Sequence, residues 1–179
     1  MSNSDLRYAA ELTRAMEMLA LDQRVVFIGQ TAIYPGTSMS GTLAGVTSDR
    51  KIEMPVAEAA QMGMSIGLSL TGWIPVSIYT RWNFLLLSVD QLVNHLDKIP
   101  LYSGYRPKVI VRTGIGSERP MHPGLQHVGD MTEAFRSICR TVNFVRLEDP
   151  DDIVPAYRKA MERDGSTVLV EICDFYNEK

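Results

Sequence analysis

The feature that most constrains the fold of this 179-residue chain is an alternation of short apolar runs with segments of helical periodicity. The apolar runs predict strands at 25–28, 74–79, 109–112, 143–147 and 167–172. Periodicity and capping signals predict helices near 6–20, 56–71, 84–96, 131–138 and 150–164. The strand runs are continuously apolar, as expected for strands covered on both faces. The pattern therefore predicts an α/β fold, a three-layer α/β/α sandwich with a mostly parallel sheet of five or six strands.

Length and composition indicate one ordinary globular domain. Hydrophobic residues make up 45% of the chain and charged residues 22%, which excludes intrinsically disordered, collagen-like and disulfide-rich classes. A chain of this length usually forms a single core. Because no repeat, low-complexity segment or linker interrupts the pattern, we expect one domain over residues 1–179.

Charge and cysteine usage limit the partners and the compartment. The formal net charge is −3, and no basic stripe is present, which disfavours a nucleic-acid partner. The N-terminus lacks the apolar stretch of a signal peptide, and no window approaches 18 uninterrupted apolar residues, so we expect no membrane association. Cys139 and Cys173 stand apart in apolar surroundings, which favours buried, reduced thiols. We therefore expect a cytoplasmic protein.

Candidate ligand-binding residues follow from the predicted sheet, because open parallel sheets bind ligands beyond the carboxyl ends of their strands. The stretch 30–50, rich in Gly, Ser and Thr and without periodicity, predicts a long loop of the functional kind at that edge. The start of the helix near residue 56 faces the same edge. This placement selects Gln30, Glu58, Arg81, Trp82, Phe84, Arg119, His122 and His127.

Residue type alone leaves two interpretations for each of the main candidates. Glu58, among small and apolar neighbours, is either an exposed first-turn carboxylate that stabilises the helix dipole or a carboxyl directed at a ligand. His127 is either a surface histidine or a catalytic one, and Phe84 is either a core residue or part of a site. His95 is expected to be structural.

Common nucleotide and metal motifs are missing from the sequence. It contains no metal-ligand spacing, Walker loop, G-x-S-x-G elbow or G-x-G-x-x-G turn. An unrelated nucleotide-binding α/β domain would need a glycine-rich turn after the first strand, and Gly29-Gln30-Thr31-Ala32 does not provide one.

The helix predicted over 56–71 carries Ala59, Gly63 and Gly67 at four-residue spacing. Small residues at this spacing form a smooth stripe that lets another backbone approach closely. The stripe packs either against the sheet of its own domain or against another subunit.

Several segments, taken together, resemble one family. In chain order they are Pro55-Val56-Ala57-Glu58-Ala59, Gly72-Trp73-Ile74-Pro75-Val76, Asn83-Phe84, Asp90-Gln91-Leu92-Val93-Asn94, Lys98, Tyr102-Ser103-Gly104 and Gln126-His127. The sequence resembles the pyrimidine-binding domain of thiamine diphosphate enzymes, most closely the beta subunit of 2-oxoacid dehydrogenases and next the transketolase-type enzymes. The resemblance runs from about Leu6 to Ile172 and is most specific from Pro55 to Gly104.

The resemblance implies the thiamine diphosphate-binding fold and a role for three matched residues. Glu58 corresponds to the glutamate that hydrogen-bonds N1′ of the cofactor's aminopyrimidine and thereby promotes deprotonation of the thiazolium carbon. Phe84 corresponds to the aromatic residue that stacks on the pyrimidine ring. His127 corresponds to a histidine that donates to the substrate's developing oxyanion or relays a proton.

The sequence departs from the family pattern at residues expected to border the cofactor. Gln30 stands where dehydrogenase-type members usually carry glutamate, and Arg81 and Trp82 replace two usual residues ahead of the stacking phenylalanine. Arg81 is either a cation that attracts an anionic substrate or a solvated side chain. Arg119 and His122 are candidate contacts for a substrate phosphate or carboxylate.

The resemblance also implies a partner subunit. The family holds its diphosphate through Mg²⁺ or Ca²⁺ bound by Gly-Asp-Gly and a downstream Asn in a different domain, and Gly129-Asp130 lacks both the third residue and the Asn. We therefore predict no metal ligand, no diphosphate-binding domain and no C-terminal transketolase domain within residues 1–179. The implied protein is one subunit of a split enzyme, with a diphosphate-binding alpha subunit in an α2β2 heterotetramer. It would act on a 2-oxo acid or a ketose, or else serve as a non-catalytic scaffold or regulatory subunit.

Overall fold

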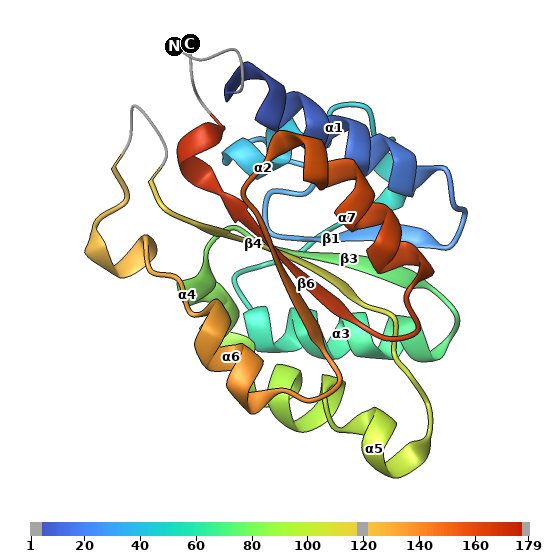
Figure 1. Ribbon diagram of the computed structural model, residues 1–179. Helices are drawn as coiled ribbons and strands as arrows, with labels where there is room; N and C mark the ends of the chain where they lie inside the picture. The colour runs from blue at the N-terminus through green and yellow to red at the C-terminus, as the bar shows by residue number, and fades with distance from the viewer. Residues whose placement is uncertain (1–4, 118–121, 177–179) are drawn as a thin grey trace.

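A computed structural model describes residues 5–117 and 122–176 (Figure 1). Its centre is one six-stranded sheet in the order β2-β1-β3-β4-β6-β5, and every neighbouring pair of strands is parallel. The strands are β1 (Val25–Gly29), β2 (Lys51–Glu53), β3 (Ile74–Tyr79), β4 (Ile110–Ile115), β5 (Asn143–Leu147) and β6 (Thr167–Ile172). The predicted α/β fold with a parallel sheet is confirmed.

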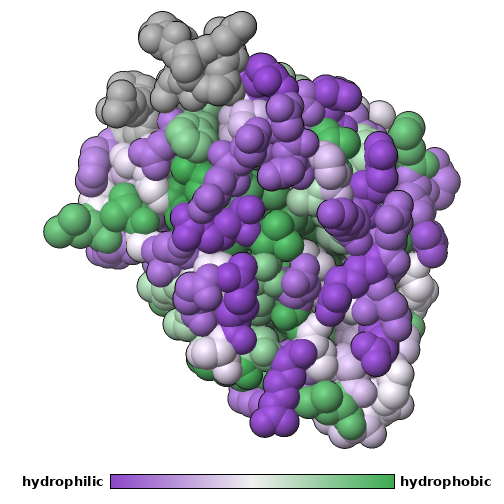
Figure 2. Space-filling model, viewed as in Figure 1, coloured by the Kyte–Doolittle hydropathy of each residue, from purple (hydrophilic) through white to green (hydrophobic). Residues whose placement is uncertain are grey.

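Helices cover both faces of the sheet (Figure 1). On one face α1 (Asp5–Ala20) and α7 (Pro150–Glu162) pack side by side, and the surface over them is mostly hydrophilic (Figure 2). On the other face lie α3 (Glu58–Leu70), α4 (Trp82–Leu85), α5 (Ile99–Ser103) and α6 (Thr132–Ile138). Within the described residues, none of the helices combines the length and the apolar character that a bilayer span requires.

The sheet separates two apolar cores, and this explains why its strands read as continuous apolar runs. Successive side chains of a strand point to opposite faces. On β4, Ile110 packs in the core under α1 and α7, whereas Val111 packs in the core under α3 and α6, as does Val109 just before the strand. The predicted burial of Cys139 and Cys173 is also confirmed, and neither forms a disulfide.

The prediction of an irregular stretch over residues 30–50 is wrong in part. This stretch contains α2 (Ser38–Gly41) and the 3-10 turn η1 (Ser48–Arg50), and it leads directly into β2. The sequence pattern does not reveal β2 because this edge strand is only three residues long and half-buried, with charged residues at both ends.

The helix predicted over 84–96 is confirmed in extent, because residues 82–96 are helical throughout, but its hydrogen-bond pattern is irregular and divides it into three short segments. They are α4, the 3-10 turn η2 (Leu86–Ser88) and the π-helical turn η3 (Gln91–Leu96). At the end of the 3-10 turn η2, the hydroxyl of the buried Ser88 donates to the carbonyl of Leu85 at 2.9 Å, a local bond that competes with regular helix geometry.

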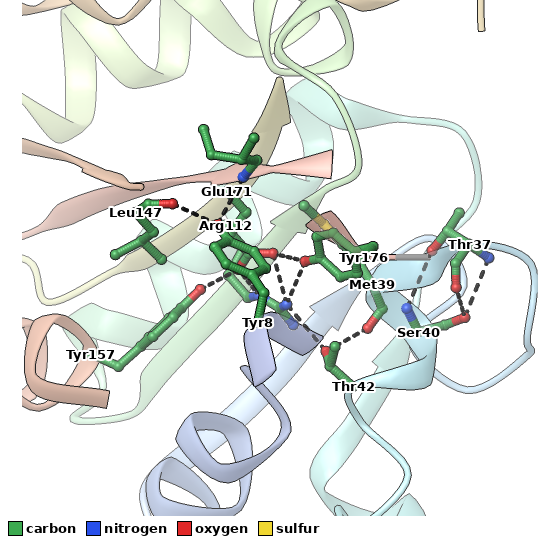
Figure 3. A network of polar contacts seen from close by, with 11 residues as sticks. Tyr8, Thr37, Met39, Ser40, Thr42, Arg112, Leu147, Tyr157, Glu171 and Tyr176 are labelled. Carbon is green, nitrogen blue, oxygen red and sulfur yellow. Dashed lines mark hydrogen bonds and ion pairs between the residues drawn. The ribbon is translucent and has the colours of Figure 1, made fainter. Parts of the chain in front are cut away.

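A fully buried ion pair joins two central strands (Figure 3). Arg112 of β4 donates from Nε to Oε1 of Glu171 on β6 at 2.7 Å and from Nη2 to Oε2 at 3.0 Å. The hydroxyls of Tyr157 and Tyr176 donate to the same carboxylate. Arg112 Nη2 also donates to the hydroxyl of Thr42, at the end of α2, at 3.1 Å. The pair thereby connects the sheet to α7 and to the segment after β1.

Burial determines the ionisation states within this network. Burial raises the pKa of Tyr157 well above its usual value, so its phenol stays protonated and can donate. Burial alone would lower the pKa of Arg112, but the adjacent Glu171 carboxylate outweighs that effect and raises the pKa. The Arg112 guanidinium is therefore charged near neutral pH.

We predict that Arg112→Met lowers the free energy of unfolding by about 3–5 kcal/mol, because it leaves the buried Glu171 carboxylate without its counter-ion. The double variant Arg112→Met/Glu171→Leu should regain part of that loss. Urea unfolding monitored by circular dichroism measures both. As a control, Arg14→Met, which removes the exposed pair with Glu11, should change stability by no more than about 0.5 kcal/mol. Equal stability of Arg112→Met and wild type would contradict this account.

Candidate functional site

A pocket opens where the strand order reverses. The chain runs from β1 to β2 on one side, and β3 is followed by β4, β6 and β5 on the other. At the carboxyl ends of β1 and β3, where open α/β sheets bind ligands, lies a small pocket. Its lining consists of Gln30, Pro55, Glu58, Gln61, Ile78, Tyr79, Thr80 and Phe84. The structure thus brings together the predicted residues Gln30, Glu58 and Phe84.

Glu58 is held by its backbone and lines this pocket. It is the first residue of α3 and is half-buried. The hydroxyl of Tyr79 donates to its backbone carbonyl at 3.3 Å, and burial raises the pKa of Tyr79 to about 12, so this donor persists at neutral pH. No described residue hydrogen-bonds the Glu58 carboxylate. A polar group in that position can bond a ligand without first losing a protein partner.

Gln61 fixes the helix that carries Glu58. Its side chain is 2% exposed, and its Nε2 donates to the carbonyl of Ile78 at 2.9 Å and contacts the Ser77 hydroxyl at 3.1 Å. These hydrogen bonds hold the first turns of α3 against β3. The sequence analysis did not select Gln61, although its spacing of three from Glu58 places both residues on one helix face.

A second cavity, of about 300 Å³, adjoins the first and shares Thr80 and Phe84 with it. The other lining residues are Gly36, Thr37, Arg81, Pro123 and His127. The rings of Phe84 and His127 lie 5.5 Å apart, centre to centre, at 38°. Phe84 is therefore half-buried between two cavities, and the alternative that it belongs to the core is wrong.

Arg81 is fixed within the site, and the alternative of a solvated side chain is wrong. It is 5% exposed, and its Nη1 donates to the carbonyl of Gly116 at 2.6 Å. Its neighbour Trp82, also a candidate by position, packs instead in the core against Phe135, with ring centres 5.0 Å apart.

The three remaining predicted contacts have different outcomes. His127 is half-buried, and its Nδ1 lies 3.0 Å from Oδ1 of Asn83. Asn83 belongs to a segment that carried the family resemblance but was given no role. His122 is exposed and lines neither cavity, and its Nδ1 accepts from the backbone of Gly124. Arg119 lies outside the described residues. His95 is exposed beside Asp90.

Glu53 orders the start of the loop that lines both cavities, and the sequence analysis missed it because β2 was not predicted. Its carboxylate accepts from the backbone amides of Thr31 at 2.6 Å and Ile33 at 2.7 Å. Thr31 has φ of +62°, a left-handed conformation that is uncommon for a residue other than glycine. The carboxylate therefore stabilises a backbone turn that a threonine would otherwise disfavour.

The outer face of α3 is apolar. Gly63 and Gly67 are exposed, and a Cβ built on either would meet open space, so the alternative that the stripe packs on its own sheet is wrong for these two glycines. Met64 and Leu70 are exposed on the same helix, whose only charged residue is Glu58.

Large apolar side chains are also exposed at this edge of the sheet. They project from the loops at the carboxyl ends of the strands, with Tyr34 at 67%, Val56 at 70% and Leu125 at 89% exposed. A hydrophobic projection at the left edge of Figure 2 lies where Figure 1 draws the short turn η4 (Leu125–His127). Among the described residues, no group of three His, Cys, Asp or Glu side chains could hold a metal ion.

Comparison with known proteins places the chain in a family. Residues 4–172 match the family model of the transketolase pyrimidine-binding domain. The chain therefore belongs to this family.

Individual relatives agree with that assignment. The pyruvate dehydrogenase E1 component subunit beta of Chlorokybus atmophyticus is 25% identical over 170 residues, covering 91% of this chain and 49% of the relative. The 3-methyl-2-oxobutanoate dehydrogenase subunit beta of Mycobacterium tuberculosis (strain CDC 1551 / Oshkosh) is 32% identical over 91 residues, covering 49% of this chain and 26% of the relative. A solved structure titled as a split gene transketolase, inactive beta4 tetramer, has a TM-score of 0.72 at 17% identity, covering 92% of this chain and 51% of that one. The chain spans about half the length of the first curated relatives it matches.

We predict that Glu53→Gln destabilises the loop after β1, because an amide has only one oxygen to accept from the amides of Thr31 and Ile33. The free energy of unfolding should fall by about 1–3 kcal/mol, and these amides should exchange with solvent faster. Hydrogen exchange followed by NMR measures the local effect. Glu133→Gln, at an exposed carboxylate paired with Arg136, should leave both amides unchanged. Unaltered exchange in Glu53→Gln would contradict the role of Glu53.

Proposed function

We propose that the chain is the pyrimidine-binding subunit of a split thiamine diphosphate-dependent enzyme that makes or breaks a carbon–carbon bond next to a carbonyl group. The substrate class is a 2-oxo acid or a ketose, and the reaction is of the 2-oxoacid decarboxylase or dehydrogenase type or of the transketolase type. Family membership and the names of the relatives support this proposal.

One observation carries it: the Glu58 carboxylate has no described hydrogen-bond partner and lines a pocket walled by the ring of Phe84. A planar ring with a polar edge suits such a pocket, because Phe84 can stack on the ring face while Glu58 bonds the edge. Gln30 lines the same pocket and supplies a neutral side chain that both donates and accepts hydrogen bonds. These residues fit the aminopyrimidine end of the proposed cofactor.

Glu58 would hold a proton at the edge of the bound ring. A carboxyl suits this task because it accepts a hydrogen bond when ionised and donates one when protonated. The bonds of Tyr79 and Gln61 keep the start of α3 in place, so the carboxyl acts from a fixed position. When bound, thiamine diphosphate supplies the electron sink for carbon–carbon chemistry.

The larger cavity beyond Phe84 is the proposed substrate site. His127 and Arg81 both line it. A guanidinium brings positive charge to a confined space, which favours an anionic substrate such as a 2-oxo acid or a sugar phosphate. The volume of about 300 Å³ lies at the lower end of the range of small-molecule sites.

A diphosphate-binding alpha subunit is the proposed partner, in an α2β2 assembly in the cytoplasm. The apolar rim formed by Tyr34, Val56 and Leu125 and the apolar face of α3 support a second polypeptide over the site. The proposed Mg²⁺ or Ca²⁺ would be held by that partner, which would carry Gly-Asp-Gly and a downstream Asn.

A non-catalytic scaffold or regulatory subunit is the competing function. It would keep the fold and the partner without requiring the Glu58 carboxyl. The exposure of that carboxyl to an otherwise well-formed pocket favours the catalytic proposal over the scaffold.

We predict that Glu58→Gln lowers kcat by about 100-fold or more, because an amide cannot exchange a proton with the bound ring. The complex isolated through a tag on this chain would be assayed with pyruvate, 3-methyl-2-oxobutanoate and a ketose phosphate donor. Glu133→Gln serves as the matched control and should retain wild-type turnover. Equal turnover by Glu58→Gln and wild type would eliminate Glu58 as a catalytic residue. A cofactor-loaded wild-type complex inactive on all three substrates would favour the scaffold.

We predict that Gly63→Leu prevents assembly with the partner while the chain itself stays folded. The Cβ of residue 63 meets open space, and leucine is the better helix former by about 0.8 kcal/mol, so the circular dichroism spectrum and Tm should be native or improved. Analytical ultracentrifugation of the tagged complex measures assembly. The control Glu162→Leu adds an exposed leucine to α7, on the opposite face, and should assemble normally. Normal assembly of Gly63→Leu would exclude the α3 face from the interface.

A further inference from the structure

The hydrogen bond between Asn83 and His127 determines where the proton of the neutral imidazole ring lies. Oδ1 of Asn83 is 3.0 Å from Nδ1 of His127. An amide oxygen only accepts hydrogen bonds, so Nδ1 must be the donor. A neutral histidine carries one N–H, and in this arrangement the second nitrogen, Nε2, holds a lone pair.

The surroundings of the ring leave that second nitrogen available. His127 lines the larger cavity, and Phe84 packs against its ring. No described residue hydrogen-bonds Nε2. Asn83 and Phe84 are adjacent on α4, so one short helix both shapes the cavity wall and sets the orientation of the imidazole.

We propose that Asn83 is a positioning residue that holds His127 in its Nδ1–H tautomer, so that Nε2 accepts a proton from the substrate in the larger cavity. This inference rests on the proposed function and specifies the role of one of its residues. A neutral ring with its proton on Nδ1 cannot donate from Nε2. Of the two roles that the family resemblance implies, the tautomer selects proton relay, and His127 donates only after it has taken up a proton.

The proton balance is simple. Where the substrate is a ketose, one of its hydroxyl groups gives its proton to Nε2, which leaves an alkoxide and an imidazolium whose Nδ1–H still bonds Asn83. The same proton returns from Nε2 to the reacting atom later in the cycle. Because the Asn83 side chain stays neutral throughout, it orients the ring without taking part in the transfer.

Nitrogen NMR of the full-length chain, labelled with ¹⁵N-histidine, tests the tautomer without cofactor or partner. The His127 signals are assigned by their loss in His127→Gln and are measured at a pH where the ring is neutral. We expect a protonated Nδ1 and an unprotonated Nε2 in wild type. A protonated Nε2 in wild type would overturn the proposal.

Variants at residue 83 extend the test. Asn83→Asp should keep the Nδ1–H tautomer, because an ionised carboxylate also only accepts, whereas Asn83→Leu should lose the preference. Asn94→Leu is the matched control, since Asn94 is exposed and bonds only Asp90, and should leave the His127 signals unchanged. Should Asn83→Leu fail to fold, the wild-type and Asn83→Asp spectra still decide the tautomer.

Kinetics of the tagged complex then separate positioning from a structural role. Asn83→Leu should lower kcat by about tenfold or more with KM within about twofold, and Asn83→Asp should recover part of the loss. Wild-type kcat in Asn83→Leu would overturn the positioning role. Wild-type turnover in Glu58→Gln would instead overturn the proposed function, and it would leave the NMR result on the tautomer standing.

Discussion

Two opposite charges buried at the centre of the sheet constrain the rest of the structure. Arg112 and Glu171 are inaccessible to water, and either charge without its partner would be strongly destabilising. Both charges also need hydrogen-bond partners. Tyr157 supplies one from α7, and Thr42 supplies one from the end of α2, so these bonds hold both elements in place. The N-terminal cap of α2 is Thr37, which lines the larger cavity. The hydrogen bonds that the buried charges need therefore also hold α2, and α2 is capped by a residue in the wall of the proposed substrate site.

The parts of the site that this chain supplies are held by hydrogen bonds, whereas the apolar residues around them are exposed. Gln61 and Glu53 anchor the start of α3 and the loop after β1 with buried or half-buried hydrogen bonds. The surrounding rim, by contrast, exposes large apolar side chains. Rigid anchoring beside an apolar rim is what a site completed by a second polypeptide requires, because the catalytic groups are placed before the partner arrives.

Local patterns were sufficient to select Glu58, Phe84 and His127, because helix starts and the ends of parallel strands are visible as short-range sequence signals. They were insufficient for Glu53, Gln61 and Asn83. These three side chains act through partners 17 to 44 positions away, namely Ile33, Ile78 and His127. The burial of Arg81 likewise depends on the Gly116 carbonyl, which the sequence places 35 positions away. Long-range pairing of this kind leaves no periodic signal.

The sequence by itself determined the layered α/β architecture, the parallel sheet and the edge at which a ligand would bind. Alternating runs of apolar residues leave few other ways to bury both faces of each strand. Only the tertiary structure decided that no described residue hydrogen-bonds the Glu58 carboxylate, that Arg81 is enclosed, and that Asn83 bonds His127. The physical reason is that hydrogen bonds are satisfied in three dimensions, between groups whose distance along the chain says nothing about their distance in space.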